Sequence, residues 1–126
     1  NEALDIINRK IAEYTKAVID GKPNFHINMA VDISPFCDCY SGNDLAIVPN
    51  VGMFASFDPV ALDVASVDMV NKMPPIPGSL LDEKINKHED KHDHFCTVSP
   101  NTQWRAGVEH AEKLGIGTSE YELIKI

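Results

Sequence analysis

The sequence has few basic residues for its length, no long hydrophobic run and only three cysteines. Acidic residues outnumber basic ones by 19 to 11, which gives a formal net charge of -8 at pH 7. This balance disfavours nucleic acid and anionic membranes as partners, because both require a basic footprint. No apolar run approaches the length of a membrane span. An odd number of cysteines favours a reducing compartment with free or metal-bound thiols.

The 126 residues are enough for one domain with its own hydrophobic core. The sequence begins at Asn1, without a methionine, and enters a helical pattern at once. We therefore expect residues 1–126 to form a single domain that is a C-terminal fragment of a longer protein.

Hydrophobic periodicity predicts an order of helices and strands along the chain. An amphipathic helix is expected from about residue 2 to Val18, and a strand with one buried face from Phe25 to Ile33. Residues 45–48 and 51–54 are expected to form two short strands, or one broken strand. The further expected elements are a mostly buried helix from Pro59 to about Asn71, a short helix capped by Ser79, a helix starting at Ser99-Pro100, and a last strand at 121–126. This order predicts an α/β or α+β layer fold, in which helices cover a small mixed sheet.

The most informative motif is Cys37-Asp38-Cys39. Residues i and i+2 of an extended segment project to the same side, so the two sulfurs can approach one metal ion or one cluster iron. Three interpretations stay open: a metal or iron–sulfur ligand pair, a redox-active pair, or two small half-buried hydrophobic side chains. The acidic surroundings raise the thiol pKa and count against the redox-active pair.

Three blocks along the chain carry a family resemblance. They are Cys37-Asp38-Cys39 with the segment 46–52, the segment 55–63 that includes Asp58-Pro59, and a tail comprising Trp104, 111–117 and 121–123. Together they resemble the uncharacterised iron–sulfur-centre proteins of domain-of-unknown-function family 362.

The resemblance implies a redox- or metal-associated domain in a cytoplasmic setting. Many members carry a ferredoxin-type segment with four closely spaced cysteines that bind a four-iron cluster. No such run exists here. The chain therefore looks like the C-terminal part of such a protein, with an iron–sulfur cluster in the parent chain, a metal ion at the Cys-Asp-Cys segment, and the rest of the parent chain, including the ferredoxin-type segment, as its partner.

The predicted metal ligands are Cys37, Cys39 and Asp38. Two thiolates do not complete a tetrahedral site. The missing ligands are expected from Asp38, Asp32, His26, Cys96 or another segment of the parent protein.

Asp63 is a carboxylate on an otherwise apolar helix, and it is expected either to accept hydrogen bonds from a neighbouring loop or to face a ligand cleft. Asp63, His26 and Asp32 are the predicted cofactor-binding residues, and no catalytic residue is assigned. Asp58 is expected to cap the helix that starts at Pro59.

The stretch from His88 to Cys96 is predicted to be a solvated connector, because charged residues saturate it and its histidine spacing does not match paired metal ligands. Trp104 is expected in the core and His110 at the surface.

Two functions of other classes remain as alternatives. One is a scaffold module without metal, in which the apolar helix from Pro59 packs against the rest of the parent chain. The other is a metal-dependent enzyme domain that uses Asp38 and Asp63.

Overall fold

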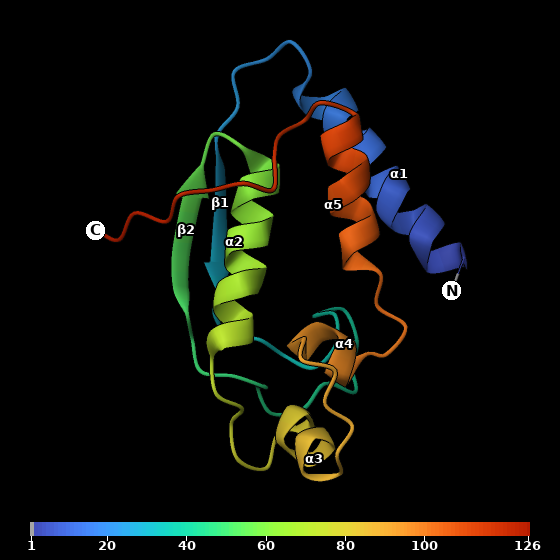
Figure 1. Ribbon diagram of the computed structural model, residues 1–126, viewed down its shortest axis with the longest axis vertical. Helices are drawn as coiled ribbons and strands as arrows, with labels where there is room; N and C mark the ends of the chain where they lie inside the picture. Colours follow the sequence, from blue (N-terminus) through green and yellow to red (C-terminus); the bar gives the residue numbers. More distant parts are fainter. Residues whose placement is uncertain (1) are drawn as a thin grey trace. The chain divides into compact units, whose positions relative to one another are not determined.

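A computed structural model describes residues 2–126, which form five helices and a two-stranded sheet (Figure 1). The elements are α1 (Glu2–Ile19), β1 (His26–Ala30), β2 (Gly52–Ser56), α2 (Pro59–Lys72), α3 (Leu80–Asn86), α4 (His94–Val98) and α5 (Trp104–Lys113). The strands are antiparallel neighbours. The predicted α/β class with a small sheet is confirmed.

The chain divides into two compact units, which are described one at a time. The α1–α5 unit comprises Asn1–Asn28, Met53–Val67 and Gln103–Ile126, and the Cys-loop unit comprises Met29–Gly52 and Asp68–Thr102. The strands and α2 continue from one unit into the other. The assignment of residues 1–126 to one domain stays a prediction.

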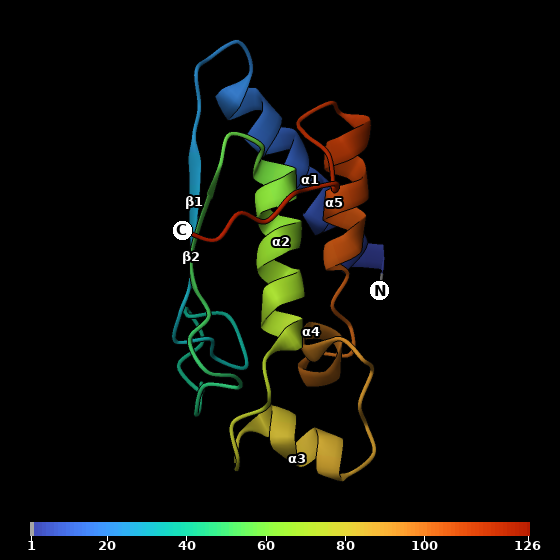
Figure 2. The same cartoon turned by 60° about the vertical axis from the view of Figure 1, so that its left-hand side comes forward.

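In the α1–α5 unit, helices α1 and α5 lie side by side (Figures 1 and 2). Small residues are buried where they meet: Ala12 of α1 and Ala111 of α5 form a core with Val60 of α2, and Val108, Leu114 and Ile116 pack against it. Asn8 Nδ2 donates to the backbone oxygen of Gln103 at 2.9 Å, and Lys16 Nζ donates to that of Leu114 at 2.6 Å. These two bonds fix both ends of the helix pair.

In this unit, the buried face of β1 is the polar face and not the apolar one. His26 and Asn28 are half-buried, whereas Phe25 and Ile27 are 53% and 56% exposed. Figure 2 shows α2 on one side of the strands and no helix on the other. The prediction that the apolar residues of this strand face the interior is therefore wrong for this part of β1. The physical reason is that Asn28 finds hydrogen-bond partners on α2, which satisfies a polar side chain on the inner face.

The Cys-loop unit has a conventional aliphatic core. Leu81 and Val48 are fully buried, and Ile47, Val70 and Val98 surround them. Helix α3 carries the predicted cap, because the Asp82 amide donates to Ser79 Oγ at 3.2 Å and the Gly78 amide donates to Asp82 Oδ2 at 2.8 Å.

Several predicted boundaries are wrong. Residues 45–48 and 121–126 form no strand, and the last helix begins at Trp104 instead of Ser99. A short helix, α4, occupies part of the stretch predicted to be a connector, because Asp93 caps it through the Cys96 amide at 3.1 Å. Trp104 is half-buried and not a core residue.

Candidate functional site

The Cys-Asp-Cys segment lies in an exposed loop, residues 34–46, which we call the Cys loop. The residues that flank it belong to the core of the Cys-loop unit, and the Ile47 amide donates to the Ile33 backbone oxygen at 2.8 Å. The loop therefore starts and ends at one anchored point, even though its own residues are mostly exposed.

Asn43 holds the interior of the loop in shape. Its Oδ1 accepts from the Phe36 amide at 3.0 Å, and its Nδ2 donates to the backbone oxygen of Cys37 at 2.9 Å. A backbone turn closes where the Tyr40 amide donates to the Cys37 oxygen at 2.8 Å. The Phe36 and Tyr40 rings pack edge to face with centroids 5.6 Å apart. Local hydrogen bonds, and not burial, position the cysteines.

The two sulfurs of the Cys loop are adjacent and free. Cys39 Sγ lies 3.0 Å from Cys37 Sγ and donates a hydrogen bond to it. The thiol and the backbone amide of Cys39 both donate to Cys37, and they lower the pKa of the Cys37 thiol. The same thiol–thiol bond raises the pKa of Cys39. The expected effect of the acidic surroundings is present for Cys37, since Asp38 acts to raise its pKa, but the hydrogen bonds outweigh it.

Both cysteines are exposed, so they do not serve as buried packing residues. Two thiolates in a tetrahedral site with metal–sulfur bonds of about 2.3 Å lie about 3.8 Å apart, so a modest opening of the pair admits an ion. Within residues 2–126, no third His, Cys, Asp or Glu side chain joins them in a metal-binding group. The residues fit half of a tetrahedral thiolate site.

The other predicted ligands lie in different surroundings. His26 Nε2 is 2.7 Å from Asn24 Oδ1, in the α1–α5 unit. Asp32, in the Cys-loop unit, is exposed with a positive φ of 48°, and its amide donates to Asn50 Oδ1 at 2.8 Å. Their role as ligands stays a prediction, as does the role of Asp38, which is exposed on the Cys loop.

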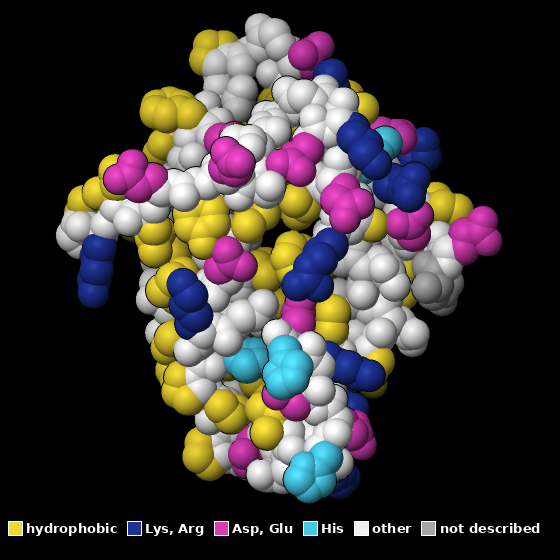
Figure 3. All heavy atoms as spheres, viewed as in Figure 1, with side chains coloured by type: hydrophobic (Ala, Val, Ile, Leu, Met, Phe, Trp, Pro, Cys, Tyr) yellow, Lys and Arg dark blue, Asp and Glu magenta, His cyan; other side chains and the backbone are white. Residues whose placement is uncertain are grey.

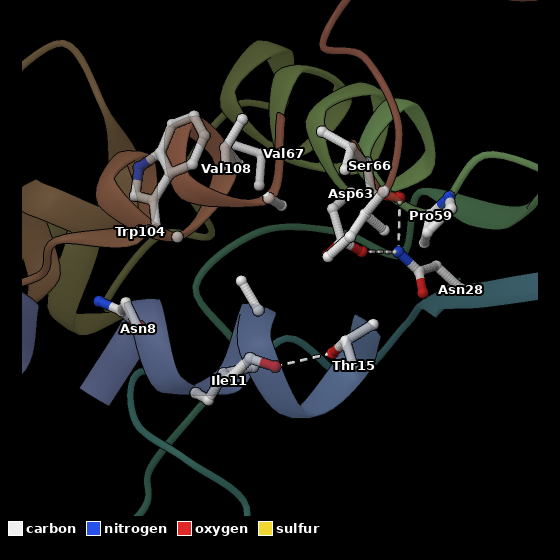
Figure 4. A pocket seen from close by; sticks show the side chains of 15 residues that line it. Asn8, Ile11, Thr15, Asn28, Pro59, Asp63, Ser66, Val67, Trp104 and Val108 are labelled. Atoms are coloured by element: carbon white, nitrogen blue, oxygen red, sulfur yellow. Dashed lines mark hydrogen bonds between the residues drawn. The ribbon is translucent and has the colours of Figure 1, made fainter. Parts of the chain in front are cut away.

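Asp58 and Asp63 have separate tasks in the α1–α5 unit. Asp58 Oδ1 accepts from the amides of Val60 and Ala61 at 2.9 Å, which confirms the predicted helix cap. Its other oxygen, Oδ2, accepts from the Thr118 amide at 2.9 Å. Asp63 Oδ1 accepts from Asn28 Nδ2 at 2.9 Å, so its partner lies on a strand and not in a loop (Figure 4).

The histidine-rich stretch is partly structural. Asp93 and Thr97 are buried, and His94 donates its amide to Asn71 Oδ1 at 2.8 Å while its Nε2 lies 2.8 Å from the Met73 oxygen. Sequence reasoning missed Asp93. The sequence contained a signal, because aspartate is a favoured N-cap residue and Asp93 directly precedes α4.

A model of the family described as "domain of unknown function (DUF362)" matches residues 1–68. The chain belongs to the DUF362 family. The match includes α1, both strands, the Cys loop and the first part of α2, whereas the resembling tail blocks from Trp104 onward lie outside it. No curated protein and no solved structure matches the chain. Among residues 2–126, no helix combines the length and the hydrophobicity that crossing a membrane requires.

Proposed function

We propose that this DUF362 domain is redox- or metal-associated, with Cys37 and Cys39 as two ligands of a metal ion or an iron–sulfur cluster. The single observation that carries the proposal is the exposed pair of sulfurs 3.0 Å apart on a braced loop. The lowered pKa of Cys37 favours the thiolate, which is the form that binds metals, whereas the raised pKa of Cys39 means that a metal ion displaces the proton of that thiol on binding.

The remaining ligands would come from a longer parent chain, including a ferredoxin-type segment, in a cytoplasmic setting. Asp38 is the candidate for an additional oxygen ligand from the Cys loop itself. An exposed pair of cysteines suits such a shared site, because a second segment can approach it without displacing the core. Soft thiolate ligands select zinc and iron over magnesium or calcium.

Metal analysis of anaerobically purified chain tests the proposal. Cys37→Ser and Cys39→Ser should each lose most of the bound zinc or iron, because neither leaves a thiolate pair. Ser41→Ala is the control, since Ser41 is exposed on the same loop, supplies no thiolate and should keep its metal. Cys96→Ser tests separately whether Cys96, on α4, is one of the additional ligands. Unchanged metal content in both Cys37→Ser and Cys39→Ser would refute the ligand role.

A specific observation also favours the scaffold module as a second candidate. The apolar stripe of α1 is exposed, with Ile7 at 53%, Tyr14 at 72% and Val18 at 65%. Large exposed apolar surfaces mark interaction sites. This interface would lie on α1, not on the helix from Pro59, because Val60, Leu62 and Ala65 of α2 are buried. A chain without metal that associates through α1 would favour this candidate.

A further inference from the structure

The α1–α5 unit contains a cavity of about 320 Å³ that is distinct from the Cys loop. Its walls come from α1, α2, α5 and Asn28 of β1, and Figure 4 shows the side chains that line it. The volume is within the range of small-molecule sites. In the space-filling view, a hollow bordered mainly by hydrophobic side chains lies where α2 and α5 face each other (Figure 3).

Most of the cavity wall is apolar. Ile11, Val67 and Val108 line it, and Trp104 lies at one end (Figure 4). Among the residues that the structure describes, no lysine or arginine lines it. An apolar body of the size of one ring therefore meets compatible surface here, whereas an anionic ligand finds no counter-charge.

The other end of the cavity is polar, and its hydrogen-bond donors are already used. Asn28 Nδ2 donates to Asp63 Oδ1 at 2.9 Å and to Ser66 Oγ at 3.2 Å. Ser66 Oγ donates to the Leu62 backbone oxygen at 2.7 Å, and Thr15 Oγ1 donates to that of Ile11 at 2.9 Å. No N–H or O–H of these side chains is left to donate to a ligand.

The side-chain atoms at this end that can still form hydrogen bonds are acceptors. Within residues 2–126, the Asp63 side chain is bonded through Oδ1 and the Asn28 side chain through Nδ2, which leaves Asp63 Oδ2 and the Asn28 oxygen as open acceptors. Neither is a buried atom without a partner, so both are accessible. Asp63 is exposed, so a ligand can reach its carboxylate from solvent. A ligand group that binds here must donate hydrogen bonds, and a positive charge strengthens them.

We propose that this cavity binds a small molecule in which a protonated amine is joined to an apolar group of about one ring. The ammonium contacts Asp63 and the Asn28 oxygen, and the apolar group lies against Val67, Val108 and Trp104. A carboxylate or phosphate at this end is rejected, because it would bring a like charge to Asp63 and find no free donor on Asn28, Ser66 or Thr15.

The chain reports on this site through its only tryptophan, Trp104, which lines the cavity. Three probes with the same ring differ in charge: phenethylamine, phenethyl alcohol and hydrocinnamate. Titration of the 126-residue chain with phenethylamine should give a saturable change in tryptophan fluorescence. The amine should bind about tenfold more tightly than the alcohol, as expected for one charge-assisted hydrogen bond. Hydrocinnamate should bind most weakly.

Asp63→Asn isolates the charge, because the amide oxygen can still accept from Asn28. This variant should lose the preference for the amine and keep its affinity for the alcohol. Asp20→Asn, an exposed change just beyond α1 in the same unit, is the matched control and should keep the preference. Circular dichroism checks that both variants fold.

Three results would each overturn the proposal: no saturable response to phenethylamine, equal affinities for the three probes, or an amine preference that survives in Asp63→Asn. The first two are obtained with the unaltered chain, so they stand even where the variant does not fold. Loss of metal binding in the cysteine variants bears only on the Cys loop and leaves this test unaffected.

Discussion

The two units of the chain bury hydrophobic residues in opposite ways. The Cys-loop unit places its large aliphatic side chains inside, with Leu81 and Val48 fully buried. The α1–α5 unit has a core of small residues beside a cavity, and it leaves Ile7 and Tyr14 of α1 mostly exposed. The first arrangement stabilises a fold and supports an exposed loop. The second leaves internal volume and apolar surface uncovered, which suits binding of a ligand or a partner.

The largest expected effect is in the tightly packed core. Leu81→Ala should lower the free energy of unfolding by about 2–5 kcal/mol, because Leu81 has no exposed surface and its neighbours cannot fill the space. Urea denaturation followed by circular dichroism measures the change. Leu123→Ala is the control, since Leu123 is 47% exposed and should change stability little.

A matched pair on α2 makes this comparison sharper. Val70 and Val60 are both 4% exposed, but Val70 belongs to the aliphatic core of the Cys-loop unit and Val60 lines the cavity. Val70→Ala should therefore destabilise more than Val60→Ala, because a side chain beside empty volume has fewer contacts to lose. Equal losses would mean that the cavity is filled or collapsed in solution.

The next effect concerns the start of α2. Asp58→Ala should lower the free energy of unfolding by about 0.5–2 kcal/mol, because it removes the acceptor for the amides of Val60 and Ala61. Thermal unfolding measures the loss. Asp58→Asn keeps a side-chain oxygen at the cap and should retain most of the stability. If Asp58→Ala left thermal unfolding unchanged, the cap would not be formed in solution.

A smaller effect is expected in the chemistry of the Cys loop. A lowered pKa keeps Cys37 as thiolate at pH values where an ordinary thiol is protonated. Cys39→Ala removes the main donor, so the pKa of Cys37 should rise and its alkylation near neutral pH should slow. Site-resolved mass spectrometry of iodoacetamide labelling against pH measures this. A rate profile for Cys37 that does not move would contradict the hydrogen bond between the two thiols.

The smallest effect is expected on the uncovered face of α1. Val18→Thr should change the free energy of unfolding by no more than about 0.5 kcal/mol, since Val18 is 65% exposed. Urea denaturation at two protein concentrations is the measurement. A loss of the size expected for a core residue would show that a partner or a second copy covers this face.

Local signals in the sequence predicted much of the fold correctly. Correct predictions include the cap at Ser79, the cap at Asp58 and the apolar helix that starts at Pro59. They could be made because capping and helical periodicity depend on residues close together in the chain. The closeness of the two sulfurs was expected from their spacing, but a turn and not an extended segment brings them together, and their exposure was not predicted.

Features that depend on residues far apart in the sequence could not be predicted. The inner face of β1 depends on the partners that Asn28 finds on α2, 35 and 38 residues away in sequence. The lowered pKa of Cys37 depends on the orientation of one thiol, which the charge of the segment does not reveal. The cavity depends on the small side chains of α1 and α5 meeting across the unit.

Asp58 also ties two distant parts of the α1–α5 unit to one carboxylate. One of its oxygens holds the first turn of α2 and the other holds Thr118, while Gly117 lies so close that even a methyl group there would overlap the carboxylate. The beginning of α2 and the segment after α5 should therefore fray together, and the amide protons of Val60, Ala61 and Thr118 should exchange with solvent in a single opening event.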